Sequence, residues 1–318
     1  MEIGSFIEFE FSKGKEYHKG ENVVRLNTAR AAIYHAVRVL GCNTVWLPYY
    51  QCDTVRTFLQ QKSINIKYYH INSAFNPLYI NLTKREAIVL VNYYGIMSSI
   101  RMNNLAKRFT NVIIDNSQAF FAEPIENCMN VYSARKFIGV PDGAYVIGTH
   151  SKIFLNEYKK DFSSDTSNFL FQRIEYGCEG KAYDSRKLNE QRIDNSDIKL
   201  MSLLTQTILD GANYDMNITK RKENFEIACY LFDEFNCINA KMYYDDTCIP
   251  MIYPLVIEDD NLLKRLHDNK IFQGHWWSYL LNEIENNTFE YWLSRYIIPI
   301  TIDQRYGEKE LSFTRSFI

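Results

Sequence analysis

The sequence predicts an α/β fold of three layers, αβα, with a mainly parallel central sheet and a smaller C-terminal α+β lobe. Short apolar runs of strand length alternate with amphipathic segments of about ten residues through the first half of the chain. The run AIVLVNYY, residues 87–94, is apolar almost without interruption, which is typical of a strand covered on both faces. At 318 residues and 46% hydrophobic composition, the chain is long enough to bury a sizeable core.

The alternation of apolar runs with amphipathic segments predicts most of the strands and helices in the first 150 residues. The expected strands are VVRL (23–26), TVWLPYY (44–50), INIKYYHI (64–71), AIVLVNYY (87–94), NVIIDN (111–116), NVYSA (130–134) and GAYVIG (143–148). Helices are expected at 29–40, 52–63 and 99–109. The first of these helices has Asn27 or Thr28 as its N-cap and Gly41 as its stop.

The domain organisation predicted from these patterns has two parts. Residues 1–200 form the large domain, and residues 201–318 form linking helices and a smaller domain. The polar stretch 151–200 lacks clear periodicity, and we interpret it as an excursion that forms a mobile flap over a site. Residues 198–235 predict long helix interrupted near Gly211. The C-terminal elements are the strands MIYPLVI and IIPITI and the helices NLLKRLHDN and FEYWLSRYI.

Composition excludes several functional classes. The net charge of -2 with interspersed signs gives no basic face for nucleic acid, and residues 220–222 (KRK) predict a solvated helix face. No apolar run reaches the length of a membrane span, and the acidic start MEIGSFIEFEF is unlike a signal peptide. Seven scattered cysteines without a C-x-x-C pair favour a reduced cytoplasmic location. The six histidines form no metal-ligand pattern, so no metal site is expected.

Polar residues gather at the predicted carboxyl ends of the strands, where ligands bind in sheets of this type. These residues are Asn27 and Thr28 before a helix, Asn92 to Gly95, Asp115 with Gln118, and Ser133 with Lys136. Each has an ordinary structural interpretation: a surface lysine, a turn-forming aspartate, a capping pair. Together they match the needs of pyridoxal phosphate, which requires a lysine amine for its aldehyde, a carboxylate for its ring nitrogen and a helix N-terminus for its phosphate.

In chain order, five segments resemble the DegT/StrS family of sugar aminotransferases, which are pyridoxal-phosphate enzymes with the fold of aspartate aminotransferase. They are LNTARAAIYHAVRVLG, TVWLPYYQCDTV, VLVNYYGI, IIDNSQAFF and VYSARKFIGVPDGAYVI. The resemblance covers residues 23 to about 147 and, more weakly, the end around IIPITIDQRY. Its most specific features are Asp115-x-x-Gln118 and Lys136 followed by Gly143.

The resemblance implies a role for each matching position. Lys136 is the catalytic lysine and general base, Asp115 pairs with the ring nitrogen, and Gln118 faces the 3-oxygen of the cofactor. The residues implied in holding the phosphate and the ring are Asn27, Thr28, Ala29, Ser133 and Tyr50. Small-molecule substrates and a homodimer are also implied.

The sequence departs from the family pattern around the lysine. The family commonly has a serine five residues before the lysine, where this chain has Val131, and its serine is Ser133. Pro141 and Asp142 stand where glycine and glutamate are usual.

Four residues are candidates for substrate contact. The segment GHWWSYL contains His275 and Trp276, which suit a sugar or nucleobase platform but equally suit core filling. Tyr94 lies at the end of a predicted strand. Arg305 is one of three arginines, with Arg295 and Arg315, that could bind the carboxylate of an amino donor.

The sequence therefore predicts an aminotransferase that moves an amino group, from glutamate, to a keto group of a nucleotide-linked deoxysugar used in a surface glycan. Two alternatives remain at this stage. One is a pyridoxal-phosphate enzyme acting on a non-sugar substrate. The other is a catalytically idle relative that binds a sugar or a partner protein.

Overall fold

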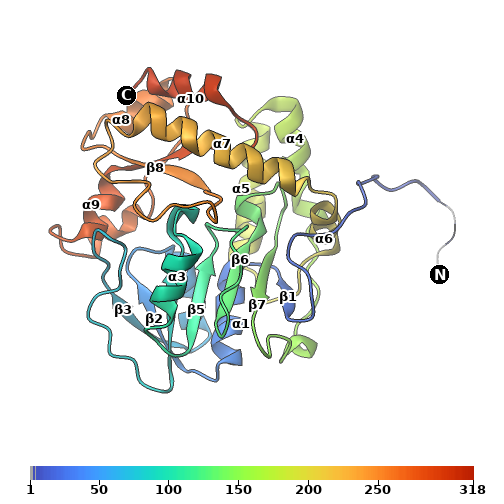
Figure 1. The fold of residues 1–318 in the computed structure, drawn as a ribbon. Helices are drawn as coiled ribbons and strands as arrows, with labels where there is room; N and C mark the ends of the chain where they lie inside the picture. Colours follow the sequence, from blue (N-terminus) through green and yellow to red (C-terminus); the bar gives the residue numbers. More distant parts are fainter. Residues whose placement is uncertain (1–2, 4) are drawn as a thin grey trace.

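The computed structural model describes residue 3 and residues 5–318, and its centre is a seven-stranded sheet (Figure 1). The strands are β1 (Val23–Leu26), β2 (Thr44–Pro48), β3 (Asn65–Tyr69), β4 (Glu86–Val91), β5 (Val112–Asn116), β6 (Met129–Ser133) and β7 (Ala144–Ile147). Their order across the sheet is β1-β7-β6-β5-β4-β2-β3. All neighbours are parallel except that β7 runs antiparallel to both β1 and β6. The predicted mainly parallel sheet is confirmed.

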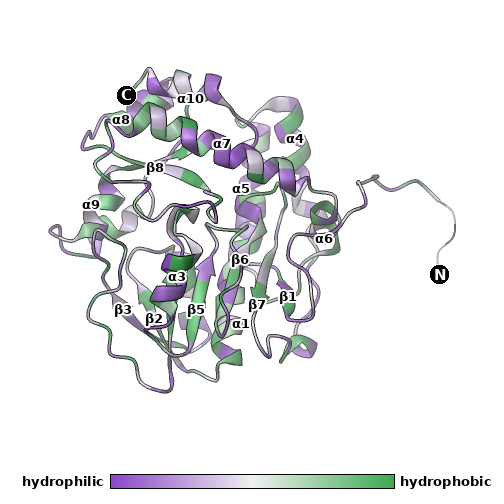
Figure 2. Cartoon of the chain, in the orientation of Figure 1, coloured by the Kyte–Doolittle hydropathy of each residue, from purple (hydrophilic) through white to green (hydrophobic). Residues whose placement is uncertain are grey.

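Helices cover both faces of this sheet. Helix α1 (Ala29–Val39) packs on one face against β1, β5, β6 and β7, and it buries Ile33 and Val37 there. On the other face, Tyr132 of β6 packs in a second apolar cluster with α6 (Leu203–Asp210). The part of the chain that forms the seven-stranded sheet contains two further helices, α2 (Asp53–Gln61) and α3 (Ser99–Ala106). Figure 2 shows hydrophobic colouring along β5, β6 and β7, as expected for strands covered on both sides.

The C-terminal part forms a smaller α+β lobe around a second, two-stranded antiparallel sheet. Its elements are α7 (Tyr214–Phe232), β8 (Ile252–Val256), α8 (Leu262–Asp268), α9 (Phe289–Tyr296), β9 (Ile297–Thr301) and α10 (Glu308–Arg315). Helix α7 begins near α6 and runs across the molecule toward α8 (Figure 1). The predicted interruption near Gly211 is confirmed, because α6 ends at Asp210 and α7 begins at Tyr214. In the described part of the chain, no helix is long and apolar enough to cross a membrane.

The stretch 151–200 contains two helices that the sequence pattern did not predict, α4 (Asn168–Tyr176) and α5 (Lys181–Asp194). Helix α5 buries only Ala182, Asn189 and Ile193, so it has no continuous apolar stripe, and ion pairs contribute to its attachment. Arg30 of α1 pairs with Asp194, and Arg135 pairs with Glu190. The excursion is therefore anchored to both α1 and the segment after β6, and a search for hydrophobic periodicity could not detect it.

A buried histidine next to the sheet gives this fold a pH dependence. His18 lies among aromatic rings, 4.1 Å from that of Tyr132 between centroids, and its Nε2 atom donates to the Phe120 carbonyl at 2.8 Å. Burial lowers the pKa of His18 to about 4, against the opposing effect of this hydrogen bond. The native state therefore takes up this proton only near pH 4, whereas an unfolded histidine takes it up near about pH 6.5.

Stability should accordingly fall as the pH falls through this window, because the unfolded state binds more protons than the native state. Between pH 8 and pH 5 we expect His18 to account for a loss of about 2 kcal/mol in the free energy of unfolding. Urea unfolding of the wild type and of His18→Phe at both pH values measures this. The pH-dependent loss should be smaller by that amount in the variant, and equal losses in the two proteins would contradict the assignment.

Candidate active site

The carboxyl ends of β1, β5 and β6 meet at one edge of the sheet. Asp115 of β5 pairs with Val131 of β6, and Ser133 follows two residues later, so the side chains of Asp115 and Ser133 lie on the same face. This is the face that α1 covers. The start of α1 reaches the same edge, since the Gly143 N–H donates to the Asn27 carbonyl at 2.7 Å. The predicted convergence of strand ends is thus present in the fold.

Asp115 is a buried carboxylate that forms no ion pair with the residues the structure describes. It is 5% exposed, and its Oδ1 accepts from the Ser117 N–H at 2.9 Å while Oδ2 accepts from Gln51 Nε2 at 2.8 Å. Within residue 3 and residues 5–318, no lysine, arginine or histidine forms an ion pair with it. A buried anion is costly unless a cation compensates it. This site therefore favours a ligand that brings a positively charged donor.

Gln118 is held in one orientation by the segment after β4. Its Oε1 accepts from the Tyr94 N–H at 2.7 Å, which leaves the Nε2 donors without a hydrogen-bond partner among the described residues. The turn that positions Tyr94 needs glycine at position 95, where φ is +73°. A Cβ atom there would lie 2.6 Å from the Gln118 carbonyl oxygen. The backbone thus aims the amide donors of Gln118 away from Tyr94.

The N-terminus of α1 offers backbone donors. Thr28 caps the helix, as predicted, by accepting from the Ala31 N–H at 3.2 Å. The N–H groups of the first turn, including that of Ala29, have no partner within the helix and suit an anion.

The side chain of Asn27 is engaged elsewhere, because Nδ2 donates to Ser196 Oγ and to the Asp197 carbonyl, and Oδ1 accepts from the Lys199 N–H. Asn27 therefore anchors the segment after α5, and its side chain is not free for a phosphate.

Lys136 lies in a short 3₁₀ turn directly after β6. The flanking strands β6 and β7 are buried, as predicted, but the lysine side chain itself is exposed. Neither the Lys136 amine nor the Ser133 hydroxyl has a side-chain hydrogen bond or ion pair among the described residues.

Gly143 turns the chain back into β7 with φ +118°, and a Cβ there would lie 2.9 Å from Thr205 Cγ2. Asp142 holds this turn, because its carboxylate accepts from the Ser202 N–H and hydroxyl at 2.8 and 2.7 Å.

An aromatic cluster covers the ends of β2 and β4. Tyr50 lies fully buried, its ring 4.4 Å from that of Trp277 and its hydroxyl 3.0 Å from that of Tyr94. The ring of Trp276 lies 5.5 Å from that of Tyr94. The fold thus brings Tyr94 and Trp276 together, and the Trp segment is at least in part core filling. The stacking role expected for Tyr50 has no support from its surroundings, because its ring has no accessible face.

The remaining predicted substrate residues are engaged in local contacts. His275 Nδ1 lies 2.9 Å from the Ile297 carbonyl. Arg305 forms an ion pair of 2.6 Å with Asp303, and its neighbour Gln304 donates to the Phe137 carbonyl at 3.0 Å. Arg305 is therefore close in the fold to the turn that contains the lysine. The other two candidate arginines pair with acidic residues: Arg295 with Asp260 and Arg315 with Glu234.

Two polar residues of this region were not identified from the sequence. Gln51, which donates to Asp115, lies three residues after the end of β2 and directly after the strand predicted at 44–50, so its position near a strand end was an available signal. Arg221 was interpreted as part of a solvated helix face, and that interpretation is wrong. It is 2% exposed, its guanidinium lies 4.5 Å from the Phe137 ring, and burial lowers its pKa to about 10. Arg221 donates to the Pro250 and Met251 carbonyls, and the charged residues around it in the sequence concealed this role.

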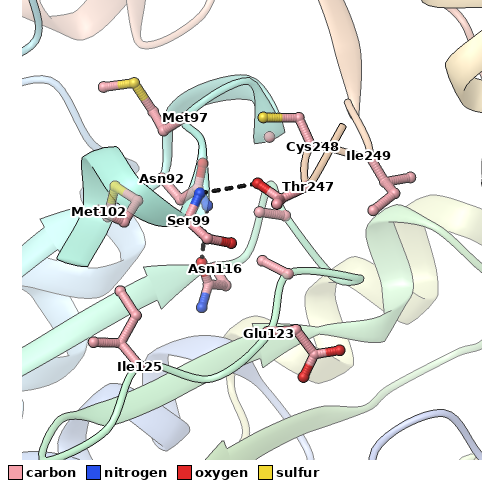
Figure 3. A pocket seen from close by; sticks show the side chains of 13 residues that line it. Asn92, Met97, Ser99, Met102, Asn116, Glu123, Ile125, Thr247, Cys248 and Ile249 are labelled. Atoms are coloured by element: carbon pink, nitrogen blue, oxygen red, sulfur yellow. Dashed lines mark hydrogen bonds between the residues drawn. The ribbon is translucent and has the colours of Figure 1, made fainter. Parts of the chain in front are cut away.

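A small cavity lies behind the site, on the opposite face of β4 and β5 (Figure 3). Figure 3 shows Asn92 and Asn116 joined by a hydrogen bond of 3.2 Å, with Thr247 of the C-terminal part bonded to Ser99. The cavity has a free volume of about 10 Å³, enough for one water molecule. Asn92 Oδ1 is buried and accepts no hydrogen bond from the residues that the structure describes, so such a water would satisfy it. The cavity is too small for a cofactor, and the candidate site is the sheet edge on the other face.

Comparison with protein-family models gives no match, and comparison with curated proteins gives none either. Solved structures are similar. One is the sugar aminotransferase CalS13 from Micromonospora echinospora, 14% identical, with 93% of this chain and 86% of that chain covered at a TM-score of 0.62. The putative sugar aminotransferase Spr1654 from Streptococcus pneumoniae, in its PMP form, is 14% identical, with 93% and 85% covered at 0.63. The GDP-4-keto-6-deoxymannose-3-dehydratase ColD, a mutant with bound GDP-perosamine, is 14% identical, with 93% and 87% covered at 0.62.

These similarities extend over nearly the whole chain, and at such low identity they establish the fold. The chain has the αβα fold of sugar aminotransferases, with its mixed central sheet and flanking helices. The predicted fold class is confirmed.

Proposed function

We propose that this protein is a pyridoxal-phosphate-dependent aminotransferase of the DegT/StrS type. The observation that carries the proposal is the buried carboxylate of Asp115, which forms no ion pair with any described residue and lies on the same sheet edge as Ser133 and the start of α1. The protonated ring nitrogen of the cofactor is a cationic donor of the kind this carboxylate lacks. An exposed lysine, Lys136, follows the neighbouring strand, and its side chain has no ion pair or hydrogen bond within the described part of the chain.

The other residues fit the remaining groups of the cofactor. The free Nε2 donors of Gln118 suit the 3-oxygen, and the first N–H groups of α1 with the Ser133 hydroxyl suit the phosphate. When bound, the cofactor supplies an aldehyde carbon for amino-group transfer and an electron-withdrawing ring. With the cofactor bound, Lys136 would provide the amine for its aldehyde and a base for the proton at the substrate carbon. Asp115 would pair with the ring nitrogen, and the aromatic cluster around Tyr94 and Trp276 would exclude water from one side.

For the reaction we propose that glutamate donates the amino group and that the acceptor is a keto group of a nucleotide-linked deoxysugar. Support comes from the solved structures of the same fold, whose names include sugar aminotransferases and an enzyme acting on a GDP-linked keto-deoxysugar. A surface glycan as destination, a cytoplasmic location and a homodimer complete this proposal. Tyr94, Trp276 and Arg305 are its candidate substrate contacts.

An absorption spectrum of the purified protein with pyridoxal phosphate, before and after addition of glutamate, tests the proposal. We expect a visible band from the lysine-linked cofactor, and we expect glutamate to remove it as the amino group is transferred to the cofactor. A protein that stays colourless with added cofactor would identify the idle alternative. A visible band that glutamate leaves unchanged would exclude glutamate as the donor.

A further inference from the structure

Gln51 gives the Asp115 carboxylate its side-chain hydrogen-bond donor within the described part of the chain. Gln51 Nε2 donates to Asp115 Oδ2 at 2.8 Å, and the other donor to this carboxylate is the Ser117 backbone N–H. A buried carboxylate stays ionised only while hydrogen bonds or a cation stabilise its charge. Because the terminal torsion of an aspartate is broad, the Gln51 amide also fixes the orientation of the two Asp115 oxygens.

The oxygen of the same Gln51 amide is buried and unused. Gln51 is 4% exposed, and its Oε1 accepts no hydrogen bond from the residues that the structure describes. The amide cannot be reversed to satisfy this atom, because Oε1 would then lie against a carboxylate oxygen of Asp115. A buried acceptor without a donor lowers stability. The Gln51 side chain is therefore better suited to orienting Asp115 than to stabilising the fold.

The C-terminal lobe holds the backbone of Gln51. The Tyr279 hydroxyl donates to the Gln51 carbonyl at 2.6 Å and lies 3.3 Å from the Tyr49 carbonyl. Tyr279 belongs to a short 3₁₀ helix, Ser278–Asn282, and is 228 residues from Gln51 in the chain. Burial raises the pKa of Tyr279, so the hydroxyl keeps the proton that it donates.

An ion pair fixes Tyr279 in turn. The Arg56 guanidinium of α2 lies 4.5 Å from the centre of the Tyr279 ring, and it pairs with Glu283 at an Nη2 to Oε1 distance of 2.6 Å. Glu283 directly follows the 3₁₀ helix that contains Tyr279. These contacts join the C-terminal lobe to the end of the sheet at Gln51.

We propose that Gln51 is a positioning residue that holds the Asp115 carboxylate ionised and oriented for the ring nitrogen of the cofactor, and that Tyr279 acts on cofactor affinity through Gln51. The inference deepens the proposed function and rests on it. Cofactor affinity then depends on the contact between the C-terminal lobe and the sheet edge, without Tyr279 having to touch the cofactor.

Equilibrium dialysis of the full chain against pyridoxal phosphate tests the proposal with Gln51→Met, Tyr279→Phe and the double variant. Gln51→Met keeps the length of the side chain but has no amide, and we expect about tenfold weaker binding because Asp115 loses one of its two donors. Tyr279→Phe loses only the hydroxyl, and we expect about threefold weaker binding. The double variant should bind like Gln51→Met alone, because effects that share one route are not additive.

Tyr214→Phe and Gln206→Met are the matched controls. The Tyr214 hydroxyl donates to the Leu209 carbonyl at 2.6 Å, and Gln206 Nε2 donates to the Met201 carbonyl at 3.0 Å, both at the second apolar cluster on the other face of the sheet. Both controls should bind pyridoxal phosphate like the wild type. In urea unfolding of the cofactor-free proteins, Gln51→Met should unfold at no lower urea concentration than Gln206→Met, because it also removes the unsatisfied Oε1.

Circular dichroism confirms that each variant is folded. Wild-type affinity in a folded Gln51→Met overturns the proposal, and so does a double variant that is weakened by the full product of the two single effects. Should Gln51→Met fail to fold, wild-type affinity in Tyr279→Phe overturns it. A wild type that binds no pyridoxal phosphate contradicts the proposed function and this inference together, whereas a wild type that binds it no better than all variants do contradicts only this inference.

Discussion

Lys136→Ala is expected to remove the visible absorption of the lysine-linked cofactor completely and to lower aminotransferase activity by about 10⁴-fold. The variant loses the amine that bonds to the cofactor and the base that moves the proton. Because the Lys136 side chain is exposed and has no ion pair among the described residues, the fold should be unaffected. Absorption spectra with pyridoxal phosphate and a transamination assay with glutamate measure both effects.

Lys152→Ala is the matched control for this experiment. Lys152 is also exposed and lies beyond β7, outside the candidate site. It should keep the band and the activity of the wild type. A Lys136→Ala protein that retains the visible band would show that another amine holds the cofactor, and the assignment of Lys136 would then be wrong.

Asp115→Asn is expected to lower activity by about 10²–10³-fold, because the ring nitrogen of the cofactor loses its ionised partner in a buried site. The substitution preserves the shape of the side chain. One of its two donors, the Ser117 N–H or Gln51 Nε2, loses its acceptor, which costs about 1 kcal/mol of stability. A modest effect on folding combined with a large effect on catalysis distinguishes this role from a purely structural one.

Steady-state rates and urea unfolding of the same samples give the two quantities for Asp115→Asn. Asp165→Asn is the comparison variant, because Asp165 is an exposed aspartate in the turn before α4. Its activity should equal that of the wild type. Equal activities for Asp115→Asn and the wild type would show that the buried carboxylate has no part in the reaction.

Much of the large domain could be predicted because its signals are local. A strand such as NVIIDN is apolar throughout, and α1 has an N-cap, apolar spacing and a glycine stop within one short stretch. Asp115 and Ser133 could be placed together because parallel strands end at a common edge. These inferences need only the chain's own periodicity and the handedness of parallel connections.

Other features depend on contacts between segments far apart in the sequence, and the sequence pattern missed them. Arg221 lies in a run of charges, yet it is buried against Phe137 and two carbonyl groups. Tyr50 follows a strand end but lies beneath Trp277. Helix α5 is held by ion pairs to Arg30 and Arg135, which produce no hydrophobic period.

The sequence by itself determined the αβα class, the order of strands and helices along the chain, and the presence of a lysine, a carboxylate and an amide after buried strands. The tertiary structure decided which of these side chains are free to bind a ligand. It left the Asp115 carboxylate buried without an ion pair among the described residues and the Lys136 amine exposed, while the Asn27 side chain is engaged in hydrogen bonds and the Tyr50 ring in packing. The physical reason is that periodicity reports which face of an element is buried, whereas the partner of each polar group depends on distant segments that only folding brings together.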